Sequence, residues 1–229
     1  MIVGSGLLAT SFSPAYAGSA EVMIYAAGVS NSSCTDPREF ERERVRVTAS
    51  LEASRDCNTF VYFSTCSILD PELADKPYVS HKDAMEQLVK DHAGYLILRL
   101  PQLAGRSANP HTLLNYLYAR ISRSERFSIW GNAARNIIDV DDVVKIARYL
   151  IDETKLRCDT VNIANIHNYP IKDIVSMMER VCGKNAIYDA IERGASFPID
   201  VQRIEPLLPE AHVEFCSSYL WHVLRKYYG

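Results

Sequence analysis

The chain has 229 residues, of which 48% are hydrophobic and 23% charged. That composition is typical of a globular protein and excludes a disordered one. The formal net charge is −3. Because a nucleic-acid binder needs a clustered excess of Lys and Arg, we expect no nucleic-acid partner. The six cysteines are scattered, with no CxxC pair, which predicts free thiols in a reducing compartment and no metal site.

The first twenty residues carry no charge, and Ala15-Tyr16-Ala17 resembles a signal-peptidase site. A signal peptide, however, needs a basic start and an unbroken apolar run, and Gly4-Ser5-Gly6 interrupts this run. Elsewhere no apolar stretch reaches the length of a membrane span. We therefore expect a cytoplasmic protein with no signal peptide and no membrane contact.

Strand and helix patterns alternate along the chain. The expected strands are Met1–Val3, Glu21–Gly28, Thr59–Thr65, Tyr95–Leu100 and Thr160–Ala164, and the expected helices are Leu7–Phe12, Pro37–Arg55, Tyr78–His92, Thr112–Ser122, Asp141–Glu153 and Ile171–Cys182. This alternation predicts an α/β fold, a parallel sheet with helices on both faces. The last third has weaker periodicity. We expect one domain over residues 1–229, in which 102–135 and 165–229 form a small substrate-binding lobe.

A glycine loop follows the first expected strand. Gly4-Ser5-Gly6-Leu7-Leu8-Ala9 fits the pattern G-x-G-x-x-A, in which the turn and the helix N-terminus bind a pyrophosphate. Only 22 − 9 = 13 positions separate Ala9 from Val22, which leaves no room for a further helix–strand–helix passage. We expect the sheet to lack two strands next to the first strand, together with the acidic residue that would bind the adenosine ribose.

Three polar residues suggest acid–base chemistry. Thr65 ends a buried strand, and Tyr78 and Lys82 stand four apart at the start of the next helix, so they share one helix face. A lysine cation beside a phenol lowers its pKa toward working pH, and the Thr65 hydroxyl could bond the same substrate oxygen. An isolated Tyr/Lys pair on a helix is otherwise an ordinary surface feature.

The order of these features resembles the short-chain dehydrogenase/reductase superfamily. Within it, the chain is similar to the extended branch of NAD-dependent epimerases and dehydratases that act on nucleotide sugars. Three later segments carry the resemblance: Leu98–Gly105 is similar to L-R-x-x-N-V-Y-G, Arg135–Val143 to R-D-F-I-Y-V-D-D-V, and Val161–Ala164 to Y-N-I-G. The resemblance implies a Rossmann-like fold and an NAD- or NADP-dependent epimerase, dehydratase or reductase of a nucleotide-activated sugar, in bacterial surface polysaccharide biosynthesis.

The same resemblance implies residue roles. Thr65, Tyr78 and Lys82 would be catalytic, with Lys82 also binding the nicotinamide ribose. The implied cofactor contacts are Gly4, Ser5, Gly6, Leu7, Leu8, Ala26, Ala27, Gly28, Pro101 and Leu103, and the implied substrate contacts are Arg135, for a diphosphate, and Asn109. Relatives commonly dimerise through two helices, which implies a homodimer through Pro37–Arg55, at its Val45–Leu51 end, and Tyr78–His92. The second helix would present Met85 and Val89, with His81 and His92 as further candidates. The alternative contact is the exposed edge of the first strand.

Departures from the family pattern keep a second interpretation open. The asparagine usual in the helix before the Thr65 strand is replaced by Glu43 or a neighbour, which puts a proton relay in doubt. Cys66 has no basic neighbour in sequence that would make it a thiolate. Because the absent strands would remove much of the adenosine contact surface, the alternative is a non-catalytic nucleotide or nucleotide-sugar binding module, or a subunit of a larger complex.

Overall fold

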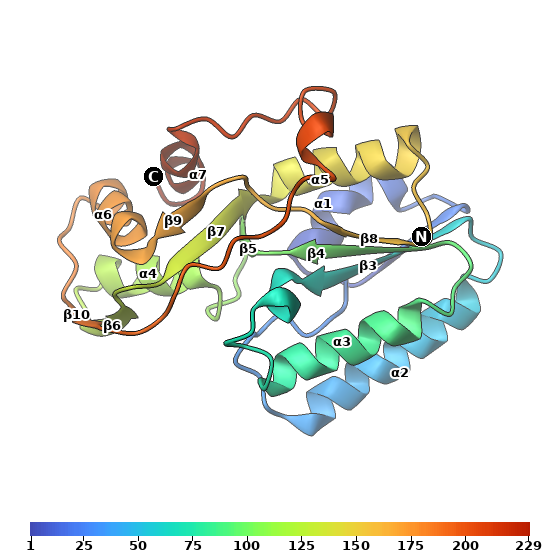
Figure 1. The fold of residues 1–229 in the computed structure, drawn as a ribbon, viewed down its shortest axis with the longest axis horizontal. Helices are drawn as coiled ribbons and strands as arrows, with labels where there is room; N and C mark the ends of the chain where they lie inside the picture. Colours follow the sequence, from blue (N-terminus) through green and yellow to red (C-terminus); the bar gives the residue numbers. More distant parts are fainter.

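A computed structural model describes residues 1–229. Its centre is a parallel sheet of five strands in the order β1-β2-β3-β4-β8 (Figure 1). The strands are β1 (Ile2–Val3), β2 (Val22–Tyr25), β3 (Thr59–Thr65), β4 (Tyr95–Leu100) and β8 (Asp159–Asn162). Strand β1 lies at the edge and pairs only with β2. The predicted absence of two strands next to the first strand is therefore confirmed.

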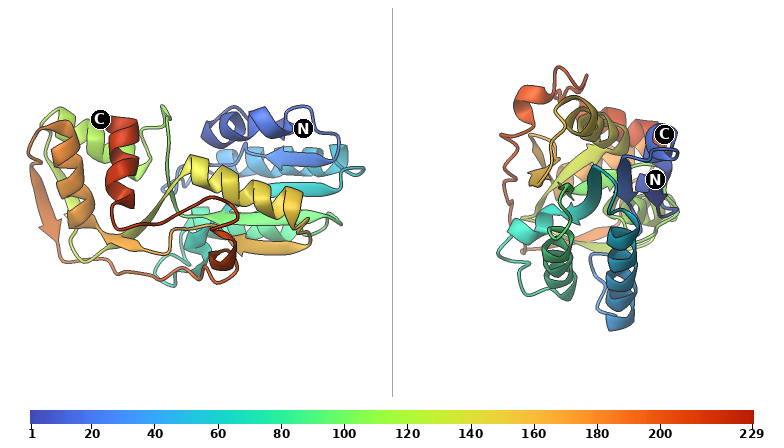
Figure 2. Two further views of the ribbon diagram at one scale, coloured as in Figure 1. Left: turned by 90° about the horizontal axis from the view of Figure 1, so that it is seen from above. Right: turned by 90° about the vertical axis from the view of Figure 1, so that its right-hand side faces the viewer.

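Helices cover both faces of this sheet, as predicted. Helices α2 (Pro37–Ala53) and α3 (Pro77–Val89) pack side by side on one face, and α1 (Leu7–Tyr16) and α5 (Val140–Arg148) cover the other (Figures 1 and 2). Helix α2 begins at a proline, and the Asp36 side chain before it accepts a hydrogen bond from the Arg38 amide at 2.9 Å, a favourable start for a helix. No helix is both long and apolar enough to span a membrane.

The alternation of side chains along β3 divides the core between the two faces. Val61 and Phe63 pack with Phe12 of α1 in the larger cluster, whereas Phe60 and Tyr62 pack under α2 and α3. Met85 and Val89 lie in this second cluster and are 3% and 0% exposed. The expectation that these two residues form a dimer contact is therefore wrong, because the sheet already covers them.

A smaller part of the molecule stands beyond the carboxyl ends of the central strands (Figure 2). It contains a sheet of β5 (Gln102–Ala104), β7 (Ala134–Asp139) and β9 (Asn168–Pro170), a strand pair of β6 (Phe127–Trp130) and β10 (Tyr188–Ile191), and the helices α4 (Leu113–Ser122), α6 (Ile171–Cys182) and α7 (Tyr219–Tyr228). Short helical turns are η1 (Cys66–Leu69), η2 (Tyr149–Glu153) and η3 (Glu205–Leu207). One hydrophobic cluster runs from Phe63 of the central sheet to Leu220 of α7, so both parts share a core.

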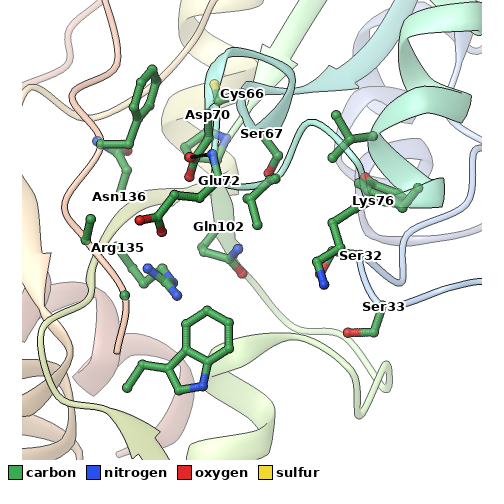
Figure 3. Close-up of a pocket in the computed structure, with 18 of the residues that line it drawn as sticks. Ser32, Ser33, Cys66, Ser67, Asp70, Glu72, Lys76, Gln102, Arg135 and Asn136 are labelled. Atoms are coloured by element: carbon green, nitrogen blue, oxygen red, sulfur yellow. Dashed lines mark hydrogen bonds between the residues drawn. The ribbon is translucent and has the colours of Figure 1, made fainter. Parts of the chain in front are cut away.

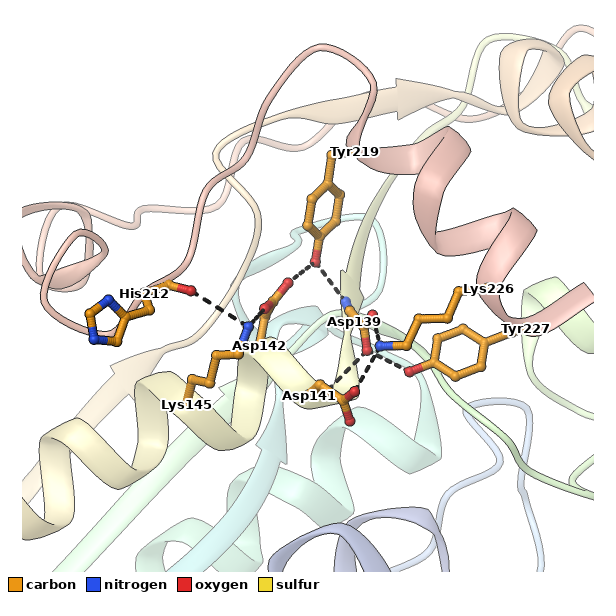
Figure 4. Close-up of polar contacts among 8 residues, drawn as sticks. All are labelled: Asp139, Asp141, Asp142, Lys145, His212, Tyr219, Lys226 and Tyr227. Carbon is orange, nitrogen blue, oxygen red and sulfur yellow. Dashed lines mark hydrogen bonds and ion pairs between the residues drawn. The ribbon is translucent and has the colours of Figure 1, made fainter.

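Polar contacts hold α7 to the start of α5 (Figure 4). We call this group the Asp139 cluster: Asp139, Asp141, Asp142, Tyr219, Lys226 and Tyr227. Asp139 accepts hydrogen bonds from Lys226 Nζ at 2.7 Å and from the Tyr227 hydroxyl at 2.6 Å. The Tyr219 hydroxyl accepts from the Asp139 amide at 2.9 Å and donates to Asp142 at 2.8 Å. These bonds join segments about eighty residues apart in the chain.

Candidate functional site

The predicted cofactor and catalytic residues gather at one edge of the central sheet. Because β1, β2, β3 and β4 are parallel, their carboxyl ends meet there. Gly4 follows β1, Ala26 to Gly28 follow β2, Thr65 closes β3, and Pro101 follows β4. In open α/β sheets a ligand binds in the crevice outside the carboxyl ends of the strands.

The glycine loop has a backbone that fits a phosphate group. Gly4 has φ +129°, and a Cβ there would lie 2.5 Å from the Ala26 carbonyl oxygen, so only glycine is tolerated. Gly6 precedes α1, whose first turn has no side-chain cap. The backbone amides of the first turn of α1 are therefore free to bind an anion, as helix N-termini do. The pyrophosphate end of a dinucleotide fits this loop, whereas the strands that would flank its adenosine end are absent.

Tyr78 and Thr65 meet where β3 ends and α3 begins. Thr65 Oγ1 accepts a hydrogen bond from the Ser67 amide at 3.1 Å, which starts the turn η1. Tyr78 lies in the first turn of α3 and is 8% exposed. Burial raises the pKa of Tyr78 above its usual value, the Glu43 carboxylate raises it further, and a hydrogen bond with Thr65 opposes both. The phenol is therefore protonated at neutral pH.

Lys82 lies one turn further along α3 and is 3% exposed. Its ammonium donates to Glu43 Oε1 and the Tyr62 hydroxyl, both at 3.0 Å, and to the Phe63 carbonyl at 3.4 Å. A lysine has three protons to donate, so protein groups use all of them. The expected effect of Lys82 on the pKa of Tyr78 stays a prediction. Binding a ribose would require one of these bonds to break.

Glu43 of α2 lies in the region where the family pattern has an asparagine. It is fully buried and accepts hydrogen bonds from the Val29 amide and the Tyr62 hydroxyl, both at 2.6 Å. His81 Nε2 lies 3.1 Å from Glu43 Oε2, the oxygen that also accepts from the Val29 amide. Burial acts to raise the pKa of Glu43, but the charge of Lys82 and these bonds outweigh burial and hold it well below its usual range. We call Glu43, Tyr62, His81 and Lys82 the Glu43 cluster.

Gly28 allows the loop after β2 to approach this cluster. A Cβ at Gly28 would lie 2.7 Å from Lys82 Nζ and 2.8 Å from Glu43 Oε1. Both atoms belong to a buried ion pair, so neither can move aside freely. The expected position of Gly28 beneath the cofactor thus coincides with a tight backbone contact to the Glu43–Lys82 pair.

A cavity of about 550 Å³ opens beside Tyr78 and extends to Arg135 on β7 (Figure 3). Pro101 also lines it. The Arg135 side chain donates one hydrogen bond, to the neighbouring Ala134 carbonyl at 2.8 Å, and makes no ion pair. Burial lowers the pKa of Arg135, while the carboxylates of Asp70 and Glu72 act in the opposite direction. A half-buried guanidinium without an ion-pair partner is suited to bind an anion.

The cavity also contains polar residues that the sequence reasoning did not select. Those of interest are Ser32, Asp70, Glu72, Lys76, Gln102 and Trp130. Gln102 could have been found, because it occupies the asparagine position of the L-R-x-x-N-V-Y-G pattern. Asp70, Glu72 and Lys76 form a charged stretch between Thr65 and Tyr78, which was a second available signal.

The remaining predicted residues lie outside this cavity. Asn109 donates a hydrogen bond to Ser30 at 3.2 Å and does not line the wall that carries Arg135. Leu103 lies on β5, and it does not line the cavity either. The structure therefore brings Tyr78, Pro101 and Arg135 to one cavity. The other predicted residues do not line it: Thr65, Lys82, residues 4–8, residues 26–28, Leu103 and Asn109.

Cys66 does line the cavity, but its thiol is not activated. It is 4% exposed, and burial raises its pKa to about 12. A thiolate is the nucleophilic form of cysteine, and at neutral pH this group is a thiol. This agrees with the expectation that Cys66 is not a thiolate.

Solved structures with the same fold include sugar-nucleotide enzymes. One is a variant of UDP-glucuronic acid 4-epimerase from Bacillus cereus with UDP-4-deoxy-4-fluoro-glucuronic acid and NAD: 18% identity, TM-score 0.76, 91% of this chain and 74% of that chain. UDP-glucose 4-epimerase of Thermus thermophilus with NAD is 15% identical with a TM-score of 0.72, and the match covers 90% of this chain and 77% of that chain. RMD from Pseudomonas aeruginosa with NADPH is 14% identical with a TM-score of 0.74, and the match covers 98% of this chain and 95% of that chain. At these identities the likeness shows the Rossmann-like fold alone.

A comparison with family models gives a more specific result, although none of the curated proteins matches the chain. The model described as the NAD dependent epimerase/dehydratase family matches residues 13–164. That range includes Thr65, Tyr78, Lys82 and Arg135, and it covers well over half of the chain. The resemblance inferred from the motifs is thereby confirmed: the chain belongs to the NAD dependent epimerase/dehydratase family.

Proposed function

We propose that this protein is an NAD- or NADP-dependent epimerase, dehydratase or reductase that acts on a nucleotide-activated sugar. The observation that carries the proposal is the cavity that is lined by Tyr78 and by Arg135, whose guanidinium makes no ion pair. A sugar diphosphate has a reacting hydroxyl or carbonyl at one end and an anion at the other. The cavity offers a matching group for each end, an acid–base hydroxyl and a cation.

The chain's own groups divide the work as follows. When bound, a nicotinamide dinucleotide supplies the hydride acceptor or donor. Tyr78 exchanges a proton with the sugar oxygen, and Thr65 orients that oxygen by a hydrogen bond. Arg135 binds the diphosphate, and the loop from Gly4 to Gly6 binds the pyrophosphate of the cofactor.

The smaller part of the molecule supplies the substrate side in this proposal. Residues 102–135 and 165–229, assigned above to a substrate lobe, contribute Trp130, Arg135 and Phe197 to the cavity wall. An aromatic ring beside a cation is suited to a nucleotide, since the base can stack while the phosphates bind the charge. Nucleotide-activated sugars are building blocks of polysaccharides, and we propose surface polysaccharide synthesis as the context.

A second candidate function is a non-catalytic binding module of the same fold. Two observations favour it: the sheet ends at β1, without strands to flank an adenosine, and Lys82 has no proton left for a ribose. Such a module would keep the Arg135 end of the cavity and bind a nucleotide sugar without using a dinucleotide.

Ligand-dependent stability separates the two candidates. A ligand present at a hundred times its Kd stabilises the folded protein by about 2.7 kcal/mol. We expect a rise in Tm with NAD, NADH or NADPH at millimolar concentration, measured by differential scanning fluorimetry. If none of the three changes Tm while UDP-glucose does, the enzyme proposal fails and the binding module remains.

The anion end is tested in the same assay with UDP-glucose as the probe. Arg135→Ala should abolish the rise in Tm caused by UDP-glucose, because the diphosphate loses its cation. Arg126→Ala is the matched control: it removes the same charge from a side chain that is 67% exposed and paired with Asp189. Equal binding by the Arg135→Ala variant and the unaltered protein would show that Arg135 does not hold the diphosphate.

A further inference from the structure

We propose that recognition of the cofactor ends at its pyrophosphate, so that the protein binds NADH and NADPH equally well and does not require their adenosine. The proposal rests on the proposed function, because it concerns the nicotinamide cofactor of that enzyme. It deepens that function by naming the class of cofactor, which is any nicotinamide nucleotide with a phosphate on its nicotinamide ribose.

The wall that holds the adenosine half of a dinucleotide is missing from the interior of the chain. Helix α1 ends at Tyr16 and β2 begins at Val22, and this short connection leads directly to the strand beside β1. In dinucleotide-binding folds, the strand on the other side of the first one precedes an acidic residue that binds the adenosine ribose. No strand occupies that side of β1, so the adenosine half has no wall to contact.

The chain also carries almost no charge in its first two strands and their loops. NADP has an additional phosphate on the adenosine ribose, so a protein selects NADP with a cation and NAD with a carboxylate. Within residues 1–35 the one charged side chain is Glu21. It precedes β2 and therefore lies at the edge of the sheet opposite the glycine loop. The loop itself, residues 4–6, is exposed and uncharged.

The next charged side chains, at the start of α2, balance one another. Residues 36–46 contain four carboxylates and four arginines. Three ion pairs form within this segment: Arg38–Asp36 at 3.1 Å, Arg42–Glu39 at 2.6 Å and Arg44–Glu41 at 2.6 Å. The fourth arginine, Arg46, lies midway along α2, which runs back from the carboxyl ends of the strands toward the start of β3. The segment therefore offers no excess of cations that would favour NADP.

One further cation follows a residue that packs on α1. A Cβ at Gly105 would lie 2.7 Å from a methyl group of Leu7, and Arg106 comes next in the chain. Arg106, however, lines a separate hollow with Tyr118 and Tyr228. That hollow is formed by α4 and the end of α7, and β1 does not contribute to it. We therefore expect Arg106 to have no effect on the choice between the two cofactors.

The half of the cofactor that the site can hold is the nicotinamide ribose phosphate. A Cβ at Gly6 would meet no atom within 4 Å, so open space borders the backbone just before the free amides of α1. A phosphate can approach the backbone closely at such a glycine. Tyr78 and Pro101, which follow β3 and β4, line the cavity where the reacting end of the cofactor would lie.

The experiment measures the Kd of NADH, of NADPH and of reduced nicotinamide mononucleotide by the fluorescence of their common reduced nicotinamide ring. A hydrogen bond to a charged group changes affinity by about tenfold or more. We therefore expect the three Kd values to differ by less than about tenfold. A larger difference would show that a residue binds the adenosine half, and the proposal would then be wrong.

The same titrations separate this inference from the proposed function. If none of the three ligands binds, the proposed enzyme function fails and this inference fails with it. If they bind with unequal affinities, the proposed function stands and this inference alone fails. The measurement needs no substrate and no turnover.

Gly6→Ala tests whether the three ligands share the glycine loop. The added methyl meets no protein atom but fills the space that a phosphate needs, and we expect all three affinities to fall by the same factor, about tenfold or more. Gly18→Ala is the matched control, because its methyl also meets open space but lies beyond the other end of α1. Unchanged affinities in Gly6→Ala would show that the ligands bind elsewhere and would overturn the proposal.

Discussion

The Glu43 cluster and the Asp139 cluster use the same three groups, a carboxylate, a lysine and tyrosine hydroxyls, in different surroundings. In the Glu43 cluster the lysine side chain is 3% exposed, whereas Lys226 in the Asp139 cluster is 42% exposed. The first lies under α2 and α3, one turn from the cavity residue Tyr78, and the second ties α7 to α5 (Figure 4). The same chemistry thus serves a site in one place and a tertiary contact in the other.

The burial of each cluster determines how much stability is lost when one of its members is substituted. A charge pair removed from water must be matched completely, because losing one partner leaves the other uncompensated. Exposed pairs are screened by solvent, and each contributes little. We therefore expect the loss of any member of the Glu43 cluster to lower the free energy of unfolding strongly. The Asp139 cluster should tolerate the loss of a charge better and depend more on its buried hydroxyl, Tyr219.

Tyrosine substitutions should give the largest contrast. We expect Tyr78→Phe to lower turnover by about 10²–10⁴-fold, because the ring stays and only the proton-transfer hydroxyl is lost. Tyr219→Phe should leave turnover intact and cost about 1–3 kcal/mol in the free energy of unfolding, because the buried Asp139 amide loses its acceptor. Steady-state kinetics and urea unfolding of both variants test this, and full activity in Tyr78→Phe would show that Tyr78 is structural.

Lysine substitutions compare the two clusters in stability alone. Lys82→Met leaves the Glu43 carboxylate buried without its cation, and we expect a loss of about 3–5 kcal/mol in the free energy of unfolding. Lys226→Met removes a charge that is 42% exposed, and the buried Asp139 carboxylate keeps its hydrogen bond from Tyr227, so we expect a smaller loss, of about 1 kcal/mol. Urea denaturation with equal m-values measures both. Similar losses in the two variants would contradict the distinction by burial.

Glycine substitutions give the smallest expected effects. Gly28→Ala places a methyl group against both charges of the buried pair, and we expect a loss of about 1–3 kcal/mol from overpacking. In Gly18→Ala the added methyl meets open space, and the stability should stay within about 0.5 kcal/mol. Thermal unfolding followed by circular dichroism measures the stability of both variants. An unchanged Tm in Gly28→Ala would mean that the loop moves away at no cost.

Long periodic segments were predictable, and short ones were not. The central strands and the helices on them carry enough periodic residues to be placed within a few positions, and α6 was placed at its observed ends. Strands of three or four residues, such as β9 and β10, are too short to show a period. Helix α7 has no side-chain cap at its start. Without that signal, and with the weak periodicity of the last third, the sequence did not predict this helix.

The site shows the same division between local and distant information. Thr65, Tyr78 and Lys82 were found because they lie close in sequence and match a known order. The partner that determines the state of Lys82 lies 39 positions away, on a helix whose alternating charges indicate a solvated surface. Only the packing of α2 against α3 shows which of those charges is buried. Sequence spacing could place the lysine, but not its ion pair.

Strand β1 has a consequence for the order in which parts of the molecule open. It has two residues and one neighbouring strand, and segments with few partners exchange their amide hydrogens through local opening at low free energy. The glycine loop follows directly, and the Ala26 amide donates to the Val3 carbonyl at 2.8 Å. The affinity for a phosphate-bearing ligand therefore includes the work of closing this edge, and slower exchange at Ala26 would report its binding without any reaction.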